Sequence, residues 1–254
     1  MKGQTYLAIA ISALALAACA KNSDICAQVT QIPEAECRAL VSLYNATDGD
    51  HWTDRRGWME NDTPCEWFAI KCEDGHVISI ALNYNELRGH LPAELSELQY
   101  LKGLSLYYNH LEGSPPPEYG QLTNLEELIL HNNLLTGNIP PEFGNMTSLK
   151  KLDLDSNNLS GEIPSELGNL PALEMLLLRG NKLSGSIPPE IGKLHNLQGL
   201  FLSNNNLTGE IPVELGNLTN LKMLSLYRND LTGSIPSALQ GLPTSGYDWG
   251  DDWQ

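Results

Sequence analysis

The stretch LKKLDLDSNNLSGEIPSELGNLPA, residues 149–172, is one copy of a unit that fills most of this 254-residue chain. Copies that begin at residues 77, 101, 125, 149, 173, 197 and 221 align with a constant step of 24 residues and no insertions. Each copy reads close to LxxLxLxxNxLxGxIPxELGNLxx, so asparagine, glycine and proline recur at fixed places. Such a period predicts a solenoid in which each copy contacts only its neighbours.

The core of each copy predicts a short β-strand. The segment Leu152-Asp153-Leu154 alternates apolar and polar residues, which is typical of a strand with one buried face. Because one such strand cannot bury its leucines alone, we expect the copies to stack about 4.8 Å apart in a parallel sheet over a leucine core. The asparagine that follows each strand can satisfy backbone groups left unpaired at the bend.

This pattern resembles the leucine-rich repeat in its plant-type 24-residue subclass, over residues 77–244. The resemblance implies an α/β solenoid: a curved right-handed superhelix with a parallel sheet on its concave face and a second short strand near each LxGxIP segment. In the second copy, the segment GSPPP at 113–117 predicts that this second strand is interrupted. In the C-terminal tail, residues 245–254, we expect Tyr247, Trp249 and Trp253 to cover the last leucines.

Residues 26–76 lack the repeat and predict an N-terminal capping region. An apolar face containing Leu40, Leu43 and Tyr44 predicts a helix that begins near Pro33. Terminal copies of a solenoid expose leucines unless another segment covers them. Three tryptophans supply the bulk for such a cover: Trp52, Trp58 and Trp67.

The stretch PCEWFAIKC, residues 64–72, taken alone leaves a metal site, redox chemistry or a disulfide open. Zinc ligands usually lie closer together and redox pairs are typically C-x-x-C, so we expect a structural disulfide and no metal. The stretch also resembles the C-x-W-x-G-V-x-C cap of plant-type repeat proteins, with Ala69 and Ile70 in place of glycine and valine. That resemblance implies a Cys65–Cys72 disulfide and leaves Cys26 to pair with Cys37.

The first residues predict export. A basic start and an apolar run that is too short to span a bilayer indicate a signal peptide over residues 1–18. The segment LAAC, residues 16–19, resembles the lipobox of bacterial lipoproteins, which implies a lipid on Cys19, a linker over 19–25 and anchoring at the outer membrane or cell surface. Ordinary cleavage after Ala20, giving a secreted protein, is the alternative. Disulfides persist in either location.

The net charge of the chain limits the classes of partner that it is expected to bind. The chain carries 31 acidic and 15 basic residues, a net charge of −16, and has no basic run. Nucleic acid is therefore excluded as an expected partner, and a membrane is expected only through the lipid anchor.

The residues between the fixed leucines form three rows across the concave sheet and are the candidate binding surface. Tyrosine, phenylalanine and arginine are the types that anchor protein interfaces, and Leu177 adds an apolar residue that we expect to be exposed. The preference of aromatic residues for strands is the alternative explanation. The predicted binding residues are Tyr84, Tyr107, Tyr108, His131, Asp153, Asp155, Arg179, Phe201, Tyr227 and Arg228.

Asp153 and Asp155 raise the possibility of an enzyme, because a spacing of about 6.5–7 Å lies near that of inverting glycosidases. An open strand, however, is expected to offer no pocket that excludes water or raises the pKa of one carboxyl. We therefore predict no catalytic residues and no cofactor. The predicted function is non-catalytic binding of an extracellular protein or peptide. The alternative is a carbohydrate-binding or surface-adhesion module, or an inhibitor of extracellular hydrolases; polysaccharide thus remains an alternative partner.

Overall fold

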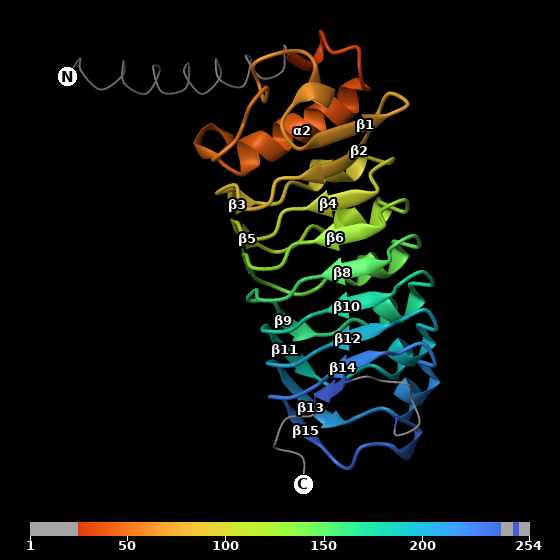
Figure 1. The fold of residues 1–254 in the computed structure, drawn as a ribbon. Helices are drawn as coiled ribbons and strands as arrows, with labels where there is room; N and C mark the ends of the chain where they lie inside the picture. The colour runs from red at the N-terminus through yellow and green to blue at the C-terminus, as the bar shows by residue number, and fades with distance from the viewer. Residues whose placement is uncertain (1–24, 240–245, 249–254) are drawn as a thin grey trace, which may run out of the picture.

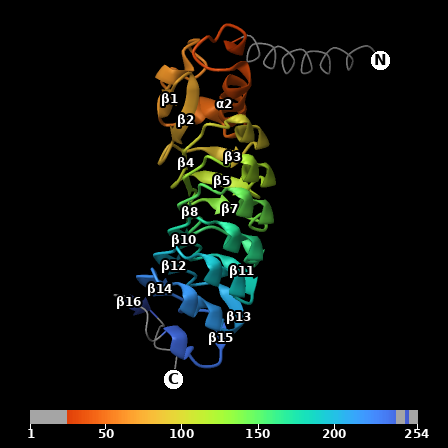
Figure 2. The same ribbon diagram turned by 90° about the vertical axis from the view of Figure 1, so that its right-hand side faces the viewer.

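The computed structural model describes residues 25–239 and 246–248 and confirms the predicted solenoid. One long sheet runs the length of the molecule, and helix α2 (Glu34–Ala46) lies at its N-terminal end (Figure 1). Short 3-10 helices lie along the side of the solenoid that is opposite the long sheet (Figure 2). No helix within these described ranges is both long enough and apolar enough to span a bilayer.

The long sheet takes one strand from each copy. Except for the antiparallel pair β1–β2, neighbouring strands are parallel. From β2 to β14 each residue pairs with one 24 positions further along, as Leu152 does with Leu176, and from β14 to β16 the step is 23. The strands are β1 (Ile70–Glu73), β2 (His76–Ala81), β4 (Gly103–Ser105), β6 (Glu127–Ile129), β8 (Lys151–Asp153), β10 (Met175–Leu177), β12 (Gly199–Phe201), β14 (Met223–Ser225) and β16 (Gly246–Asp248). The backbone of the tail thus adds a strand, whereas the side chains expected to cover the last leucines lie outside the described residues.

The second strand of each copy forms two further sheets. The first contains β3 (Arg88–His90), β5 (His110–Gly113) and β7 (Leu134–Leu135); the second contains β9 (Ser160–Glu162), β11 (Lys182–Gly185), β13 (Asn206–Glu210) and β15 (Asp230–Thr232). The predicted interruption in the second copy was wrong, because β5 pairs with both β3 and β7. This strand ends at Gly113, before the prolines, so no proline has to donate a ladder hydrogen bond.

On the convex side, each copy contributes a 3-10 helix. These helices span Ala93–Glu97, Pro117–Gln121, Pro141–Asn145, Ser165–Asn169, Pro189–Lys193, Val213–Asn217 and Ser237–Leu239. The glycine of the ELGN segment lets successive helices approach closely. A Cβ on Gly144 would lie 2.3 Å from the carbonyl oxygen of Glu166, and one on Gly168 would lie 2.4 Å from that of Glu190.

The recurring asparagine joins consecutive copies by hydrogen bonds. The Asn157 amide donates to the carbonyl oxygens of Leu130 and Leu154, both at 3.1 Å, and its Oδ1 accepts the backbone N–H of Leu135 at 3.1 Å. Equivalent bonds are made by Asn109, Asn133, Asn181, Asn205 and Asn229. We call this series the asparagine ladder; it satisfies buried backbone groups that the turn leaves unpaired.

The ladder continues into the capping region. Asn85 donates to the carbonyl oxygen of Asp54 at 2.9 Å and accepts the backbone N–H of the same residue at 2.6 Å. The cap also contains the 3-10 helices Gly49–His51 and Pro64–Glu66. Trp58 is fully buried and packs between Trp52 and Trp67, with ring centroids 4.9 and 5.0 Å away.

Both disulfides lie in this cap. The structure pairs Cys26 with Cys37, which joins the chain before α2 to the helix, and Cys65 with Cys72, which closes the loop that carries Trp67. Among the described residues, no group of three or more His, Cys, Asp and Glu side chains is placed to hold a metal ion.

The asparagine ladder makes a testable prediction about stability. Asn157→Ala leaves the buried N–H of Leu135 without its acceptor, while the carbonyl oxygens of Leu130 and Leu154 each keep one other asparagine donor. We therefore expect a loss of about 1–3 kcal/mol in the free energy of unfolding. Urea unfolding followed by circular dichroism measures it. The control is Asn158→Ala at the neighbouring, half-buried asparagine, where we expect a change within about 0.5 kcal/mol. Equal losses for both variants would contradict the role of the ladder.

Candidate functional site

The third row of the concave face has a backbone conformation that was not predicted. Each of its residues has a positive φ, between 52° and 65°. This left-handed region suits glycine and asparagine and is an outlier for a bulky side chain. The recurrence of asparagine and glycine in the row was the available sequence signal. We call these residues the left-handed row: Tyr84, Tyr108, Asn132, Ser156, Gly180, Asn204 and Arg228.

Aromatic rings gather at the N-terminal end of the concave face. The rings of Tyr84 and Tyr108 stack with centroids 4.6 Å apart and planes 10° from parallel, and those of Tyr107 and His131 stack at 4.5 Å and 12°. The two stacks are nearly perpendicular, because the planes of Tyr84 and Tyr107 cross at 84°. Tyr84 is 61% exposed and Tyr108 is 46% exposed. We call these four residues the aromatic corner.

Two aspartates lie next to the aromatic corner, and both are buried. Asp153, at the end of β8, lies with Oδ2 3.1 Å from Nδ1 of His131 and 3.4 Å from Nζ of Lys151. The expectation that Asp153, Asp155 and Leu177 point freely off the sheet was wrong, since all three are less than 9% exposed. His131 and Lys151 contact the carboxylate of Asp153, and Arg179 contacts that of Asp155.

Asp155 is held by Arg179 of the next copy. Its Oδ1 accepts the Arg179 backbone N–H at 2.6 Å, and its Oδ2 accepts the Nε–H at 2.7 Å. Burial raises the pKa of the Asp155 carboxyl above its ordinary value, and hydrogen bonds and charge from Arg179 oppose that rise. The sequence-based view that an open strand cannot raise a carboxyl pKa was therefore wrong for Asp155. The Arg179 guanidinium lies 4.8 Å from the centroid of the Phe201 ring.

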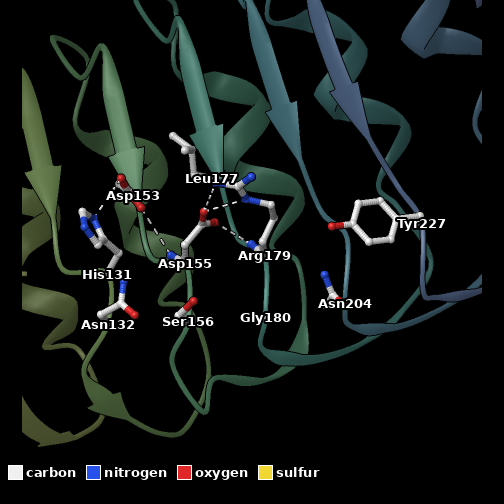
Figure 3. A pocket seen from close by; sticks show the side chains of 10 residues that line it. All are labelled: His131, Asn132, Asp153, Asp155, Ser156, Leu177, Arg179, Gly180, Asn204 and Tyr227. Carbon is white, nitrogen blue, oxygen red and sulfur yellow. Dashed lines mark hydrogen bonds and ion pairs between the residues drawn. The ribbon is translucent and has the colours of Figure 1, made fainter. Parts of the chain in front are cut away.

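A hollow of about 390 Å³ that is open to solvent occupies the centre of the concave face. Figure 3 shows His131 at one end of it and, at the other, Tyr227 with its hydroxyl directed inward. The hollow lies where the third to sixth copies carry small residues in the left-handed row. Its lining residues are His131, Asn132, Asp153, Asp155, Ser156, Leu177, Arg179, Gly180, Asn204 and Tyr227.

The structure thus divides the ten predicted binding residues into groups. His131, Asp153, Asp155, Arg179 and Tyr227 line the hollow, Tyr84, Tyr107 and Tyr108 lie in the aromatic corner, and Phe201 packs against Arg179. Arg228 lies beyond the hollow, 5.9 Å from the centroid of the Tyr227 ring, and donates to Oδ1 of Asn204 at 3.3 Å. The prediction omitted the small lining residues Asn132, Ser156, Gly180 and Asn204, because it selected for large side chains.

Two known protein families match the repeat region of the chain. The family described as leucine rich repeat matches residues 123–183, and the one described as leucine rich repeats (2 copies) matches 171–213 and 195–243. A probable leucine-rich repeat receptor-like protein kinase of Arabidopsis thaliana is 36% identical over an alignment of 79 residues, and the match covers 26% of this chain. The chain spans only 8% of the length of that curated relative.

Solved structures match over more of the chain. The Arabidopsis receptor kinase HAESA ectodomain, in complex with an IDA peptide hormone, is 37% identical with a TM-score of 0.71 over 81% of this chain and 35% of that one. Pollen Receptor Kinase 3 is 36% identical with a TM-score of 0.68 over 78% of this chain and 97% of that one. A plant ice-binding protein is 27% identical with a TM-score of 0.69 over 86% and 87%. Since similar solenoids serve different functions, function has to be inferred from the site.

The Asp155–Arg179 pair predicts a pH-dependent effect. In Arg179→Ala, the buried carboxyl loses its cation, so its folded-state pKa rises further above the unfolded value. A raised carboxyl pKa favours folding at low pH, and that contribution is lost as pH rises through it. We therefore expect Arg179→Ala to cost about 1–3 kcal/mol of unfolding free energy at pH 7 and clearly less at pH 3.5.

Urea unfolding at both pH values measures this difference; pH 3.5 also avoids precipitation near the calculated isoelectric point of 4.6. Arg228→Ala is the matched control, because Arg228 contacts an amide and a ring but no described carboxylate. Its cost should be the same at both pH values. A pH-independent loss in Arg179→Ala would show that its charge is not what stabilises Asp155.

Proposed function

The chain belongs to the plant-type leucine-rich repeat proteins, and on that premise we propose that it binds an extended peptide, or an extended segment of another protein, across its concave face outside the cell. The hollow between His131 and Tyr227 is the observation that carries the proposal. These two residues are four strand steps apart, about 19 Å. That span accommodates about five or six residues of extended peptide.

The chemistry of the hollow supports a peptide ligand. Its ends carry tyrosine and histidine rings and its centre carries an arginine, and Tyr and Arg are enriched among residues that dominate binding energy. Asp155 and Phe201 hold the Arg179 guanidinium in place before any ligand arrives. A preformed side chain loses less conformational entropy on binding. The HAESA ectodomain with its peptide hormone offers a precedent in a similar solenoid.

We propose that this binding involves no catalysis by the chain. Both oxygens of Asp155 already accept hydrogen bonds from Arg179, and Asp153 is paired with His131 and Lys151. Neither aspartate is therefore free to act as a nucleophile or a general base. For the hollow, the competing functions are polysaccharide binding, surface adhesion and inhibition of an extracellular hydrolase.

A variant whose side chain fills the hollow tests whether the hollow binds peptide. The left-handed row accepts tyrosine at positions 84 and 108, so Ser156→Tyr should fold normally while its ring occupies the hollow. We expect peptides of about ten residues, selected from a displayed library on the wild-type protein, to bind this variant at least tenfold more weakly, as fluorescence polarisation would measure.

The control is Ser165→Tyr, which places the same ring at an exposed position on the convex side. Peptide affinity should then match the wild type. If the library yields no binder, or if both variants bind equally well, the hollow is not a peptide site. If the selected peptides lose affinity in Ser165→Tyr but not in Ser156→Tyr, the peptide-binding surface lies on the convex side instead.

We also propose that Cys19, which lies outside the described residues, carries a lipid that anchors the protein at the outer membrane or cell surface. The LAAC segment supports this proposal. We expect Cys19→Ser to lose incorporation of labelled palmitate and to release the protein into the soluble fraction, whereas Asn22→Ser should retain both label and anchoring. Label that persists in Cys19→Ser would refute lipidation at this residue and favour cleavage after Ala20.

A further inference from the structure

We propose that the aromatic corner is a second binding site, adjoining the hollow, which takes the ring of an uncharged hexopyranose within a polysaccharide. Tyr84, in the first copy, provides the main stacking surface, and Tyr107 and Tyr108 of the second copy border it. The fourth residue of the corner, His131, stacks on Tyr107 and also lines the near end of the hollow, so the two sites adjoin at this residue.

The backbone supplies the first observation. Tyr84 and Tyr108 both have φ of 53°, a conformation that costs a bulky residue of order 1–3 kcal/mol. Asparagine occupies the same row at positions 132 and 204, so a better-suited residue is compatible with this turn. The left-handed turn itself belongs to the repeat, since all seven copies have it, but a tyrosine there keeps a cost that an asparagine would lower. What the two tyrosines share is an exposed ring that neither asparagine provides.

The second observation is the arrangement of the rings. At a centroid separation of 4.6 Å, Tyr84 and Tyr108 leave no space between them, and the Tyr107–His131 stack is equally closed. A proline-rich peptide docks in grooves between aromatic rings, and this arrangement offers no such groove. Tyr84 is nevertheless 61% exposed, so much of its ring surface is accessible beside its two ring partners Tyr107 and Tyr108.

The third observation concerns the phenol groups. In the described part of the chain, the hydroxyls of Tyr84, Tyr107 and Tyr108 make no hydrogen bond to protein. Partial burial, followed by the neighbouring phenols, raises the pKa of Tyr84, so its hydroxyl is neutral at pH 7 and can both donate and accept. The corner thus combines an accessible ring surface with several uncommitted hydroxyls.

A pyranose ring matches this combination. Its C–H groups form an apolar face that can pack on an aromatic ring, and its hydroxyls form a polar rim that can bond to the phenols. A neutral sugar fits better than a uronic acid, because the chain carries a net charge of −16 and repels polyanions.

Isothermal titration of the full protein with cellohexaose, mannohexaose and maltohexaose tests the site, with an oligogalacturonate of the same length as the anionic probe. We expect at least one neutral hexaose to bind and the oligogalacturonate not to. Tyr84→Asn should lower the affinity at least tenfold, and it should fold, because asparagine occupies the same row in two other copies. Tyr84→Phe, which keeps the ring, should lose less than fivefold.

Tyr100→Ala is the matched control, since Tyr100 is 52% exposed but stacks on His76, away from the corner. It should bind like the wild type, as should Ser156→Tyr, which fills only the hollow. The proposal is overturned if no neutral hexaose binds, if Tyr84→Asn retains full affinity, or if Tyr100→Ala is equally damaging. Loss of peptide binding in Tyr84→Asn without any sugar binding would also overturn it, by assigning the corner to the peptide.

Discussion

The asparagine ladder is the interaction on which the rest of the structure depends. The strands of the long sheet are only three to six residues long, and the chain must turn sharply after each strand. The buried amides satisfy the carbonyl oxygens and N–H groups that this turn exposes, both within a copy and between consecutive copies. Through Asn85 the same bonds connect the cap to the first copy, so the cap and the repeats share one register.

Because the ladder and the leucines determine the backbone, the remaining concave positions can vary without changing the fold. The binding surface is therefore shaped by side-chain size from copy to copy. Large residues in the left-handed row produce the aromatic corner and the Arg228 end, and small ones between them produce the hollow. The two proposed sites differ in chemistry although they occupy equivalent positions on one scaffold.

Much of this architecture was predictable, because a 24-residue period constrains every copy at once. The strands, the leucine core and the place of the asparagine follow from it, whereas the capping helix follows from the apolar face of residues that precede the repeats. The burial of Asp153, Asp155 and Leu177 was not predictable, since it depends on which rotamers the neighbouring copies adopt. The hollow was missed for a related reason: it results from absent side chains, whereas sequence patterns draw attention to large and charged residues.

The glycines on the convex side affect the curvature of the concave face. A side chain on Gly144 or Gly168 would meet the backbone of the next 3-10 helix and force adjacent helices apart. The strands on the other face would keep their spacing, because hydrogen bonds join them. A longer outer arc against an unchanged inner arc bends a solenoid more tightly and brings the two ends of its inner surface together. The length of ligand that fits the concave face is therefore set partly by the curvature that these distant glycines permit.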